Sequence, residues 1–463
     1  MNQIINTENN NIQKFFEMEE RYSLFDYQTK EGIKYWDIVR YEIFCYIISN
    51  NIFIQKNRKR NLLFIYKIIK YCFYLIIFLL KIFLNRPHYL CFICSRNKDN
   101  YGRNLDIISQ DIISRLPYNK RLLIETFSNN NGKGQFSYIF NSGLILYKYL
   151  FKLKNIFHNN CDYYEIIEII SKTFNISIND KLIIDTIITN NINRYIIERN
   201  YYKKLFSLLK PKLIFMTQDG IQKGMFNAAN YLNIPLVELQ HGFIGYSHPV
   251  YSYPQSILRG QILDLPKYLF AFSHFWTKTI NYPVNSIKYI GNSYYAKKIT
   301  KKEIKYDIVF IMGLYNNCIL SLIDNLLKLN FNYNICIKLH PAQIFNYNNI
   351  LEKYKYTNNI NIIRNELSIS KLLSETECII TVNSTCIYEA LHNNVKVFLL
   401  KVPGYYTMQN IYDNPLVKEI TSAEDIISLK NINIINQKNN ITYFEEFNEK
   451  EFYNFLDKHT SLC

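Results

Sequence analysis

Hydrophobic positions divide the 463-residue chain into an amino-terminal part with helical spacing and a longer part in which strands and helices alternate. Within residues 1–85, apolar side chains recur at helical spacing, most regularly in GIKYWDIVRYEIFCYII. From His88 onward, short apolar runs alternate with amphipathic stretches, which is typical of an α/β protein. The pattern therefore predicts a helical amino-terminal extension over 1–85, followed by an α/β fold.

Two strand–helix series follow the extension. The first has expected strands at 89–95, 120–127, 211–219 and 234–241. A helix at 220–233 joins the last two of them, and so short a crossover predicts parallel strands. The second series has expected strands at 306–313, 332–341, 359–365, 377–383 and 395–401. We therefore predict two Rossmann-like lobes that face a cleft, over residues 86–268 and 269–430, and a helical tail over 431–463.

The segment 56–85 is strongly apolar, but its longest run without charge, 71–80, is too short for the ~20 apolar residues of a spanning helix. On a helical wheel its basic side chains fall on one side: Lys56, Arg60, Lys67, Lys70 and Lys81. This pattern predicts a helix that lies in the interface of an anionic membrane. A helix that packs on the protein with its lysines in solvent fits the pattern equally well.

Composition narrows the class of partner. The chain is 48% hydrophobic, which is enough to bury a core in each lobe, and its net charge of +16 favours an anionic partner. No RNP-like, zinc-finger or helix-turn-helix motif is present, so we do not expect nucleic-acid binding. The pair Cys91 and Cys94 lies within an expected strand, which favours a position in the core rather than a role in a metal site. The amino terminus does not resemble a signal peptide, so we expect a cytoplasmic protein.

Polar residues follow directly after four of the expected strands, in the stretches TQDG, LQHG, KLHP and TVNST. In parallel sheets, ligands bind at the carboxyl ends of the strands. The first two stretches contain Asp219-Gly220 and His241-Gly242, whose glycines would let the chain turn sharply beside a ligand. We expect these polar residues to line a functional site in each lobe.

The second lobe carries the candidate anion site. Ser384 and Thr385 begin an expected helix, where free N–H groups favour a phosphate, although both residue types are also common helix caps. Glu389, one turn later, could accept hydrogen bonds from ribose hydroxyls or simply be an exposed helix residue. His340, before a proline, could donate to a phosphate oxygen or be an ordinary loop histidine.

The set LQHG, KLHP and NST–YEAL, over residues 86–425, resembles bacterial GT-B glycosyltransferases of capsule and lipopolysaccharide synthesis. The group includes sialyltransferases and β-Kdo transferases, and the CDP-glycerol glycerophosphotransferases share its layout. The resemblance implies that His340, Ser384 and Thr385 hold the phosphate of a nucleotide-sugar donor. It also implies a CMP-linked donor sugar, such as sialic acid or Kdo.

The same resemblance implies an acceptor side in the first lobe. Asp219 would be the general base that takes a proton from the acceptor hydroxyl, with Gly220 and Gly242 lining the site. His241 would line the acceptor side or act as acid/base. The loop that carries His248 and Tyr251 would cover the same cleft. The acceptor would be a glycan or a lipid-linked glycan, and the enzyme would work peripherally at the inner face of the cytoplasmic membrane.

No DxD motif occurs in the chain, which predicts transfer without a metal ion or another cofactor. In such a reaction a helix dipole, a histidine and hydroxyls stabilise the leaving group. Glycerol-phosphate transfer from CDP-glycerol remains an alternative, because that reaction needs the same phosphate-binding site. A nucleotide-sugar 2-epimerase is disfavoured, since the expected helix start lacks a Ser-Gly-Gly loop. A non-catalytic scaffold of a polysaccharide assembly complex is the alternative outside the enzymes.

Overall fold

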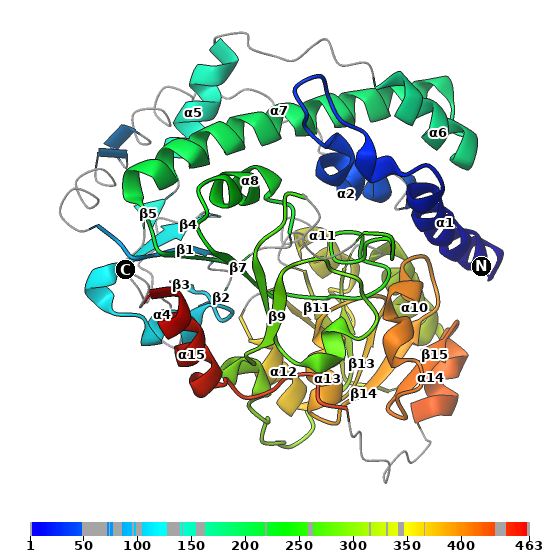
Figure 1. Ribbon diagram of the computed structural model, residues 1–463. Helices are drawn as coiled ribbons and strands as arrows, with labels where there is room; N and C mark the ends of the chain where they lie inside the picture. Colours follow the sequence, from blue (N-terminus) through cyan, green and yellow to red (C-terminus); the bar gives the residue numbers. More distant parts are fainter. Residues whose placement is uncertain are drawn as a thin grey trace. The chain divides into compact units, whose positions relative to one another are not determined.

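The computed structural model describes residues 2–48, 72–73, 75–76, 86–94, 97–98, 104–126, 139–140, 142–153, 163–217, 220–257, 263–313, 316–329, 332–340, 347–364, 366–430 and 441–460 (Figure 1). The chain divides into two compact units. We call Lys14–Tyr294 with Glu445–Cys463 the first unit, and Met1–Gln13 with Tyr295–Phe444 the second unit.

The first unit is built on a seven-stranded sheet in which every neighbouring pair is parallel. Its strands lie in the order β5 (Ile139–Phe140), β4 (Arg121–Glu125), β1 (Tyr89–Ile93), β6 (Leu213–Thr217), β7 (Leu236–Leu239), β8 (Tyr268–Ala271) and β9 (Ser286–Tyr289). From β1 the chain first adds β4 and β5 on one side of the sheet. It then returns to the other side of β1 and adds β6, β7, β8 and β9 in turn. This reversal between β1 and β6 is the topological switch point of a Rossmann-like sheet.

The second unit has a six-stranded parallel sheet with the same kind of order. Its strands lie in the order β12 (Ile360–Ile363), β11 (Ile335–Lys338), β10 (Tyr306–Ile311), β13 (Thr376–Thr381), β14 (Lys396–Leu400) and β15 (Val417–Ile420). The strand order reverses between β10 and β13. The predicted α/β class with two Rossmann-like parts is therefore confirmed. Separately, β2 (Asn97–Lys98) and β3 (Asn104–Leu105) form a short antiparallel ribbon in the first unit.

Helices flank both sheets. Those of the first unit are α2 (Tyr35–Ile48), α4 (Gln110–Arg115), α5 (Ser142–Leu153), α6 (Tyr164–Phe174), α7 (Ile178–Leu209), α8 (Lys223–Tyr231) and α15 (Glu449–Thr460). Those of the second unit are α10 (Asn316–Lys328), α11 (Tyr347–Lys353), α12 (Ile369–Ser374), α13 (Cys386–His392) and α14 (Ala423–Lys430). The division between the units falls within α1 (Asn2–Arg21) and α9 (Ser293–Ala296). Short 3₁₀-helices are η1 (Leu24–Asp26), η2 (Tyr118–Lys120), η3 (His274–Thr277) and η5 (Tyr405–Ile411).

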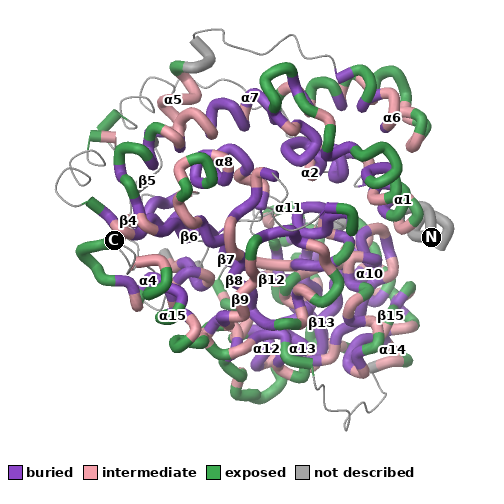
Figure 2. The backbone as a smooth tube through the Cα atoms, viewed as in Figure 1, coloured by how far each residue is buried: buried purple, intermediate pink, exposed green. Residues whose placement is uncertain are grey.

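The central strands are buried on both faces, which explains their continuous apolar sequences (Figure 2). On one face, Phe92 of β1 packs with Phe206 of α7 and Phe226 of α8. On the other face, Phe215 of β6 packs with Phe452 of α15. The last helix of the chain thus covers one face of the first sheet, although its sequence lies after the whole second unit.

The first unit extends past the boundary that the sequence pattern placed at residue 268. Strand β8 pairs parallel with β7, and β9 pairs parallel with β8, so they complete the first sheet, and the first segment of the unit runs to Tyr294. The sequence gives little sign of β9, because its four residues, SIKY, are all only partly buried. Strand β9 lies at the sheet edge and has no continuous apolar run for a pattern to detect.

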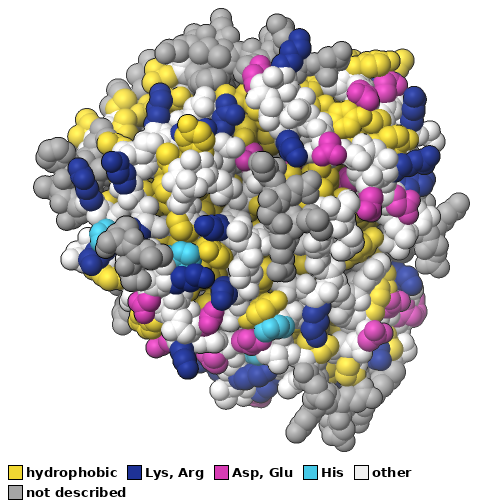
Figure 3. All heavy atoms as spheres, viewed as in Figure 1, with side chains coloured by type: hydrophobic (Ala, Val, Ile, Leu, Met, Phe, Trp, Pro, Cys, Tyr) yellow, Lys and Arg dark blue, Asp and Glu magenta, His cyan; other side chains and the backbone are white. Residues whose placement is uncertain are grey.

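The basic stripe of segment 56–85 lies outside the described residues, so its membrane contact stays a prediction. Of that segment the structure describes four residues around Leu75, which packs against the core of the first unit. Phe73 and Ile76 are 61% and 57% exposed. Among the helices that the structure describes, none combines the length and the apolar character of a membrane span. On the face seen in Figure 3, Lys and Arg side chains lie among Asp and Glu side chains.

Candidate functional sites

In the second unit, the carboxyl ends of β10 and β13 are the switch point at which such sheets bind ligands. Gly313 follows β10, and Asn383 follows β13. A Cβ atom on Gly313 would lie 4.0 Å from the carbonyl oxygen and from the side-chain oxygen of Asn383. The two loops are therefore neighbours, and they form the rim of a candidate ligand site.

Three predicted phosphate-binding residues lie on loops at this edge of the sheet. His340 comes two residues after β11 and is exposed. The Oγ of Ser384 accepts a hydrogen bond from the backbone N–H of Cys386 at 3.3 Å. Thr385 is exposed, and its side chain makes no capping bond to α13. The hydroxyl of Ser384 thus supports the start of the helix, as the capping alternative expects, whereas that of Thr385 makes no capping bond.

Glu389, in the first turn of α13, is partly buried beside Cys386. Burial raises the pKa of the Glu389 carboxyl to about 8, from an ordinary value of 4.5. Burial, and then the neighbouring Glu389, raise the pKa of the Cys386 thiol to about 12. A carboxyl group that is protonated near neutral pH can donate as well as accept a hydrogen bond. Glu389 can therefore pair with a hydroxyl group in either direction.

Lys338 is a buried cation that the sequence analysis did not select. It ends β11, and its ammonium donates a hydrogen bond to the carbonyl oxygen of Arg364. Burial lowers the pKa of Lys338, while Cys386 and then Glu366 act in the opposite direction. The sequence offered one signal for Lys338, because it stands two residues before the selected His340, at the end of an expected strand. Lysine is rarely buried, so its place in an apolar strand is unusual.

The raised pKa of Glu389 predicts a pH dependence of stability. Because the folded-state pKa lies above the ordinary value of 4.5, the folded chain holds a proton that the unfolded chain releases as pH rises from 4.5 toward 8. This group therefore lowers stability across that interval. We expect Glu389→Gln to raise the melting temperature relative to wild type more at pH 8 than at pH 5, as measured by calorimetry. An equal difference at both pH values would contradict the prediction.

In the first unit, Asp106 ties together the two strand ends at the switch point. Its Oδ2 accepts hydrogen bonds from the Cys94 backbone N–H at 3.0 Å, from Ser109 Oγ at 2.8 Å and from Thr217 Oγ1 at 3.1 Å. Cys94 follows β1, and Thr217 ends β6. Asp106 is buried, and burial raises its pKa even though these bonds lower it. Asp106 thus joins the carboxyl ends of β1 and β6 at the switch point.

Asp219 lies outside the described residues, two positions after β6, so its role as the base stays a prediction. Gly220, which follows it, is described and has a φ of +71°. A Cβ atom there would lie 2.4 Å from Cγ1 of Val250. Both the backbone conformation and the space therefore require glycine at this position. The spatial requirement comes from Val250, which belongs to the 241–257 loop.

The chain after β7 is held by a buried glutamine. Gln240 accepts a hydrogen bond from the Phe272 backbone N–H through Oε1 at 2.8 Å. Its Nε2 donates to the carbonyl oxygen of Gly242 at 2.9 Å. His241 lies between these anchored positions and is half-buried. Gln240 thus fixes the backbone on which His241 and Gly242 stand, at the carboxyl end of β7.

The following loop is built around Glu238, a fully buried carboxyl group inside β7. Tyr251 donates to its Oε1 at 2.9 Å, and Tyr282 donates to its Oε2 at 2.7 Å. The side chain of Tyr251, predicted to face the acceptor, is therefore buried and supports the loop from within. His248 is half-buried, and its ring stacks on Tyr41 of α2 with centroids 5.9 Å apart.

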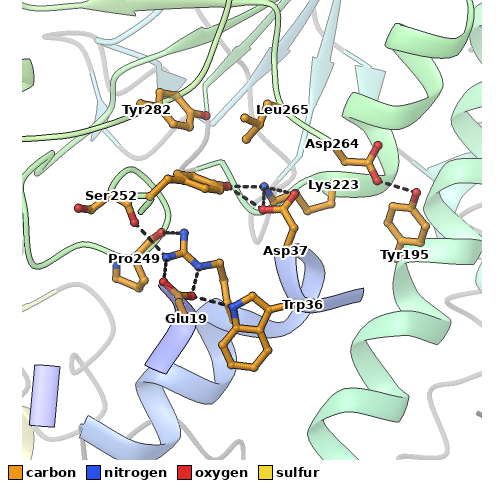
Figure 4. A network of polar contacts seen from close by, with 12 residues as sticks. Glu19, Trp36, Asp37, Tyr195, Lys223, Pro249, Ser252, Asp264, Leu265 and Tyr282 are labelled. Atoms are coloured by element: carbon orange, nitrogen blue, oxygen red, sulfur yellow. Dashed lines mark hydrogen bonds and ion pairs between the residues drawn. The ribbon is translucent and has the colours of Figure 1, made fainter. Parts of the chain in front are cut away.

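A buried polar network joins α1, α2 and α8 to this loop (Figure 4). Arg40 donates to both carboxylate oxygens of Glu19, at 2.7 and 2.6 Å, and to the carbonyl oxygens of Pro249 and Ser252. Next to it, the Lys223 ammonium donates to both oxygens of Asp37, at 2.9 and 3.0 Å, and to Tyr253 at 3.0 Å. The amino-terminal helices thus hold the 249–253 loop in place.

Sequence reasoning missed this network, because two of its charged residues sit singly in an apolar helix and Glu19 is one of several charged residues in α1. Asp37 and Arg40 both lie in YWDIVRYEIF, where a charge would normally face solvent. The informative signal is that α2 is apolar nearly all round, which is typical of a buried helix. Within the described part of the chain, no three His, Cys, Asp or Glu side chains come together as a metal site requires.

No protein-family model matches the chain, and no curated protein matches its sequence. Among solved structures, the Methanocaldococcus jannaschii UDP-GlcNAc 2-epimerase bound to UDP-GlcNAc and UDP is similar at 14% identity. The alignment covers 81% of this chain and 99% of that chain, with a TM-score of 0.46. The Acinetobacter baumannii MurG is similar at 13% identity over 74% of this chain and 90% of that chain, with a TM-score of 0.38.

The wall teichoic acid polymerase TagF with CDPG is also similar, at 13% identity over 75% of this chain and 80% of that chain, with a TM-score of 0.41. The two-unit α/β architecture of this protein rests on the strand orders described above.

Proposed function

We propose that the protein is a GT-B glycosyltransferase that moves a sugar from a nucleotide-sugar to a surface-glycan acceptor without a metal ion. The observation that carries the proposal is the strand order, since each unit has a reversal point at which polar loops gather. Two Rossmann-like units in one chain suit a two-substrate reaction, with one unit for the donor and one for the acceptor.

In this proposal the second unit binds the donor. His340 and the hydroxyls of Ser384 and Thr385 contact the phosphate, and Glu389 pairs with a ribose hydroxyl. Lys338 ends β11, two residues before His340, and adds positive charge at the same edge. The leaving nucleotide is thus stabilised by hydrogen-bond donors and by a cation, which requires no divalent metal.

The first unit binds the acceptor. Asp219 takes the proton from the attacking hydroxyl, while His241, Gly242 and His248 surround the acceptor. Support comes from the anchored backbone on either side of His241 and from the packing that fixes Gly220. The donor that we favour is CMP-linked, such as sialic acid or Kdo.

Nucleotide binding tests the proposal. We expect CMP to raise the melting temperature, with CDP, UDP, GDP and dTDP compared in parallel and each repeated with EDTA. A ligand at 100 times its Kd adds about 2.7 kcal/mol of stability, which is readily measured. Stabilisation by CDP alone would favour glycerol-phosphate transfer, and stabilisation by UDP or GDP would favour a hexose donor. The absence of any shift would contradict the proposal and favour a scaffold.

His340→Ala should abolish most of that stabilisation, because the variant lacks the donor to the phosphate. His274→Ala is the matched control, since His274 is also exposed but lies in the first unit, where it stacks on Tyr289. We expect the control to keep the nucleotide-dependent shift. Equal shifts in both variants would remove His340 from the donor site.

We further propose that the protein works at the inner face of the cytoplasmic membrane through segment 56–85. Each basic side chain near an anionic surface contributes about 1 kcal/mol, so replacing Lys67, Lys70 and Lys81 with Glu should strongly weaken binding. The measurement is co-sedimentation with vesicles that contain phosphatidylserine or phosphatidylglycerol. Failure of the wild-type protein to bind these vesicles would show that the segment packs on the protein instead.

A further inference from the structure

The first unit has a pocket of about 440 Å³ at the edge of its sheet opposite the candidate catalytic loops. The pocket is lined by the end of α8 and by the residues that lead into β7, β8 and β9. It therefore lies at the amino ends of these strands, whereas His241 and Gly220 lie at the carboxyl ends. We propose that this pocket binds a neutral, polyhydroxylated ligand, namely a segment of a glycan.

Charge argues for a neutral ligand. Among the described residues that line the pocket, Asp264 and Lys267 are the acidic and the basic side chain, so the formal charge is balanced. Asp264 is already engaged, since its Oδ2 accepts a hydrogen bond from Tyr195 at 2.7 Å (Figure 4). Its Oδ1 accepts a hydrogen bond from Asn227 at 2.9 Å. Lys203 lies outside this lining, over the ring of Tyr231, so the lining itself carries no excess of positive charge.

The amide groups argue for hydroxyl-rich chemistry. Four asparagines line the pocket: Asn227, Asn230, Asn233 and Asn285. The nitrogen of Asn227 is held by Asp264, and that of Asn230 donates to the carbonyl oxygen of Leu265 at 3.0 Å. Each of these bonds fixes the orientation of an amide whose oxygen remains an acceptor for a ligand hydroxyl. Groups oriented before binding lose little entropy when a ligand arrives.

The rim supplies an aromatic surface. Tyr231, at the end of α8, is 69% exposed, and the Lys203 ammonium lies 3.7 Å from its ring centroid. A cation over one face of the ring holds the tyrosine in position. Pro266 and Pro283, which are buried, also belong to the lining. A sugar ring presents C–H groups on its faces and hydroxyls around its edge, which suits this combination of tyrosine, prolines and amides.

The inference does not rest on the proposed transfer reaction, because it follows from the lining alone. The test uses saturation-transfer NMR on the full-length chain, with the neutral tetrasaccharides of β-1,4-linked N-acetylglucosamine, β-1,4-linked glucose and α-1,4-linked glucose as probes. We expect at least one probe to receive saturation from the wild-type protein. Tyr231→Ala and Asn285→Ala, both at exposed positions, should each raise its Kd about tenfold or more.

Tyr118→Ala is the matched control, since Tyr118 lies in the same unit, is 74% exposed and is outside the pocket. The proposal is supported if this control still binds the probe, if both pocket variants lose binding, and if the nucleotide response is unchanged. The proposal is overturned if no probe binds the wild type, if the pocket variants bind as tightly as the wild type, or if binding depends on His340 instead. The unchanged nucleotide response separates failure of the pocket from failure of the donor site.

Discussion

Asp219→Asn is expected to lower turnover by about 10²–10⁴-fold, the usual contribution of a general base. Asparagine has nearly the shape of aspartate but cannot take a proton from the acceptor hydroxyl. Donor binding should be unaffected, because the proposed donor residues belong to the second unit. The measurements are kcat with the nucleotide-sugar that corresponds to the stabilising nucleotide, and the nucleotide-dependent rise in melting temperature of the variant.

Asp185→Asn provides the control for this change, because Asp185 is exposed on α7. It should leave kcat unchanged within error. Normal turnover by Asp219→Asn would remove Asp219 as the base. Loss of nucleotide stabilisation in the same variant would contradict the division of roles between the two units.

The fold was largely predictable from hydrophobic pattern, because buried parallel strands require continuous apolar runs. Strands β1, β4, β6 and β7 of the first unit lie within the expected ranges. So do β10, β11 and β12 of the second unit. The pattern did not select β8, although three of its four residues are buried, or the outer strands β9 and β15, where partly exposed residues alternate with buried ones or replace them. Edge strands bury less surface, so their sequences are less constrained.

The candidate sites were predictable only as positions in the fold. Strand ends can be located from sequence, and so His340 and Ser384 were selected before their surroundings were known. The direction of each side chain was not predictable. Tyr251 illustrates this, because its hydroxyl donates to the buried carboxyl group of Glu238, thirteen residues earlier in the chain and inside β7. Pairings of this kind depend on tertiary packing, which a single sequence does not specify.

The buried network was the least predictable feature, and it carries the second large effect. Arg40→Met is expected to lower the free energy of unfolding of the first unit by about 3–5 kcal/mol, the usual cost of leaving one partner of a buried ion pair uncompensated. Both side chains of the Arg40–Glu19 pair are almost completely buried, at 2% and 0% exposure. The change also removes the donor to Pro249 and Ser252, which releases the loop after β7.

The two tryptophans of the chain make this measurement specific, since Trp36 and Trp276 both lie in the first unit. Trp36 donates to Glu19 at 2.8 Å, so its fluorescence reports on the network itself. Urea unfolding followed by tryptophan emission therefore measures the stability of this unit. Arg194→Met is the matched control, because the Arg194–Glu42 pair likewise joins two helices, α7 and α2, but is 38% and 24% exposed. Its loss should cost about 1 kcal/mol or less.

The effect of Arg40→Met should also depend on pH. Burial raises the pKa of Glu19 above 4.5 even in the wild type, where Arg40 opposes the rise. Without Arg40 the folded-state pKa rises further, so the folded variant holds a proton that the unfolded chain releases above about pH 4.5. The stability gap between wild type and variant should therefore widen from pH 5 to pH 8. Adding Glu19→Gln to the Arg40→Met variant should narrow its stability gap to the wild type at pH 8, because the second change removes the unpaired charge. A gap that is independent of pH, or a double variant no more stable than Arg40→Met at pH 8, would mean that lost packing rather than the buried carboxylate causes the destabilisation.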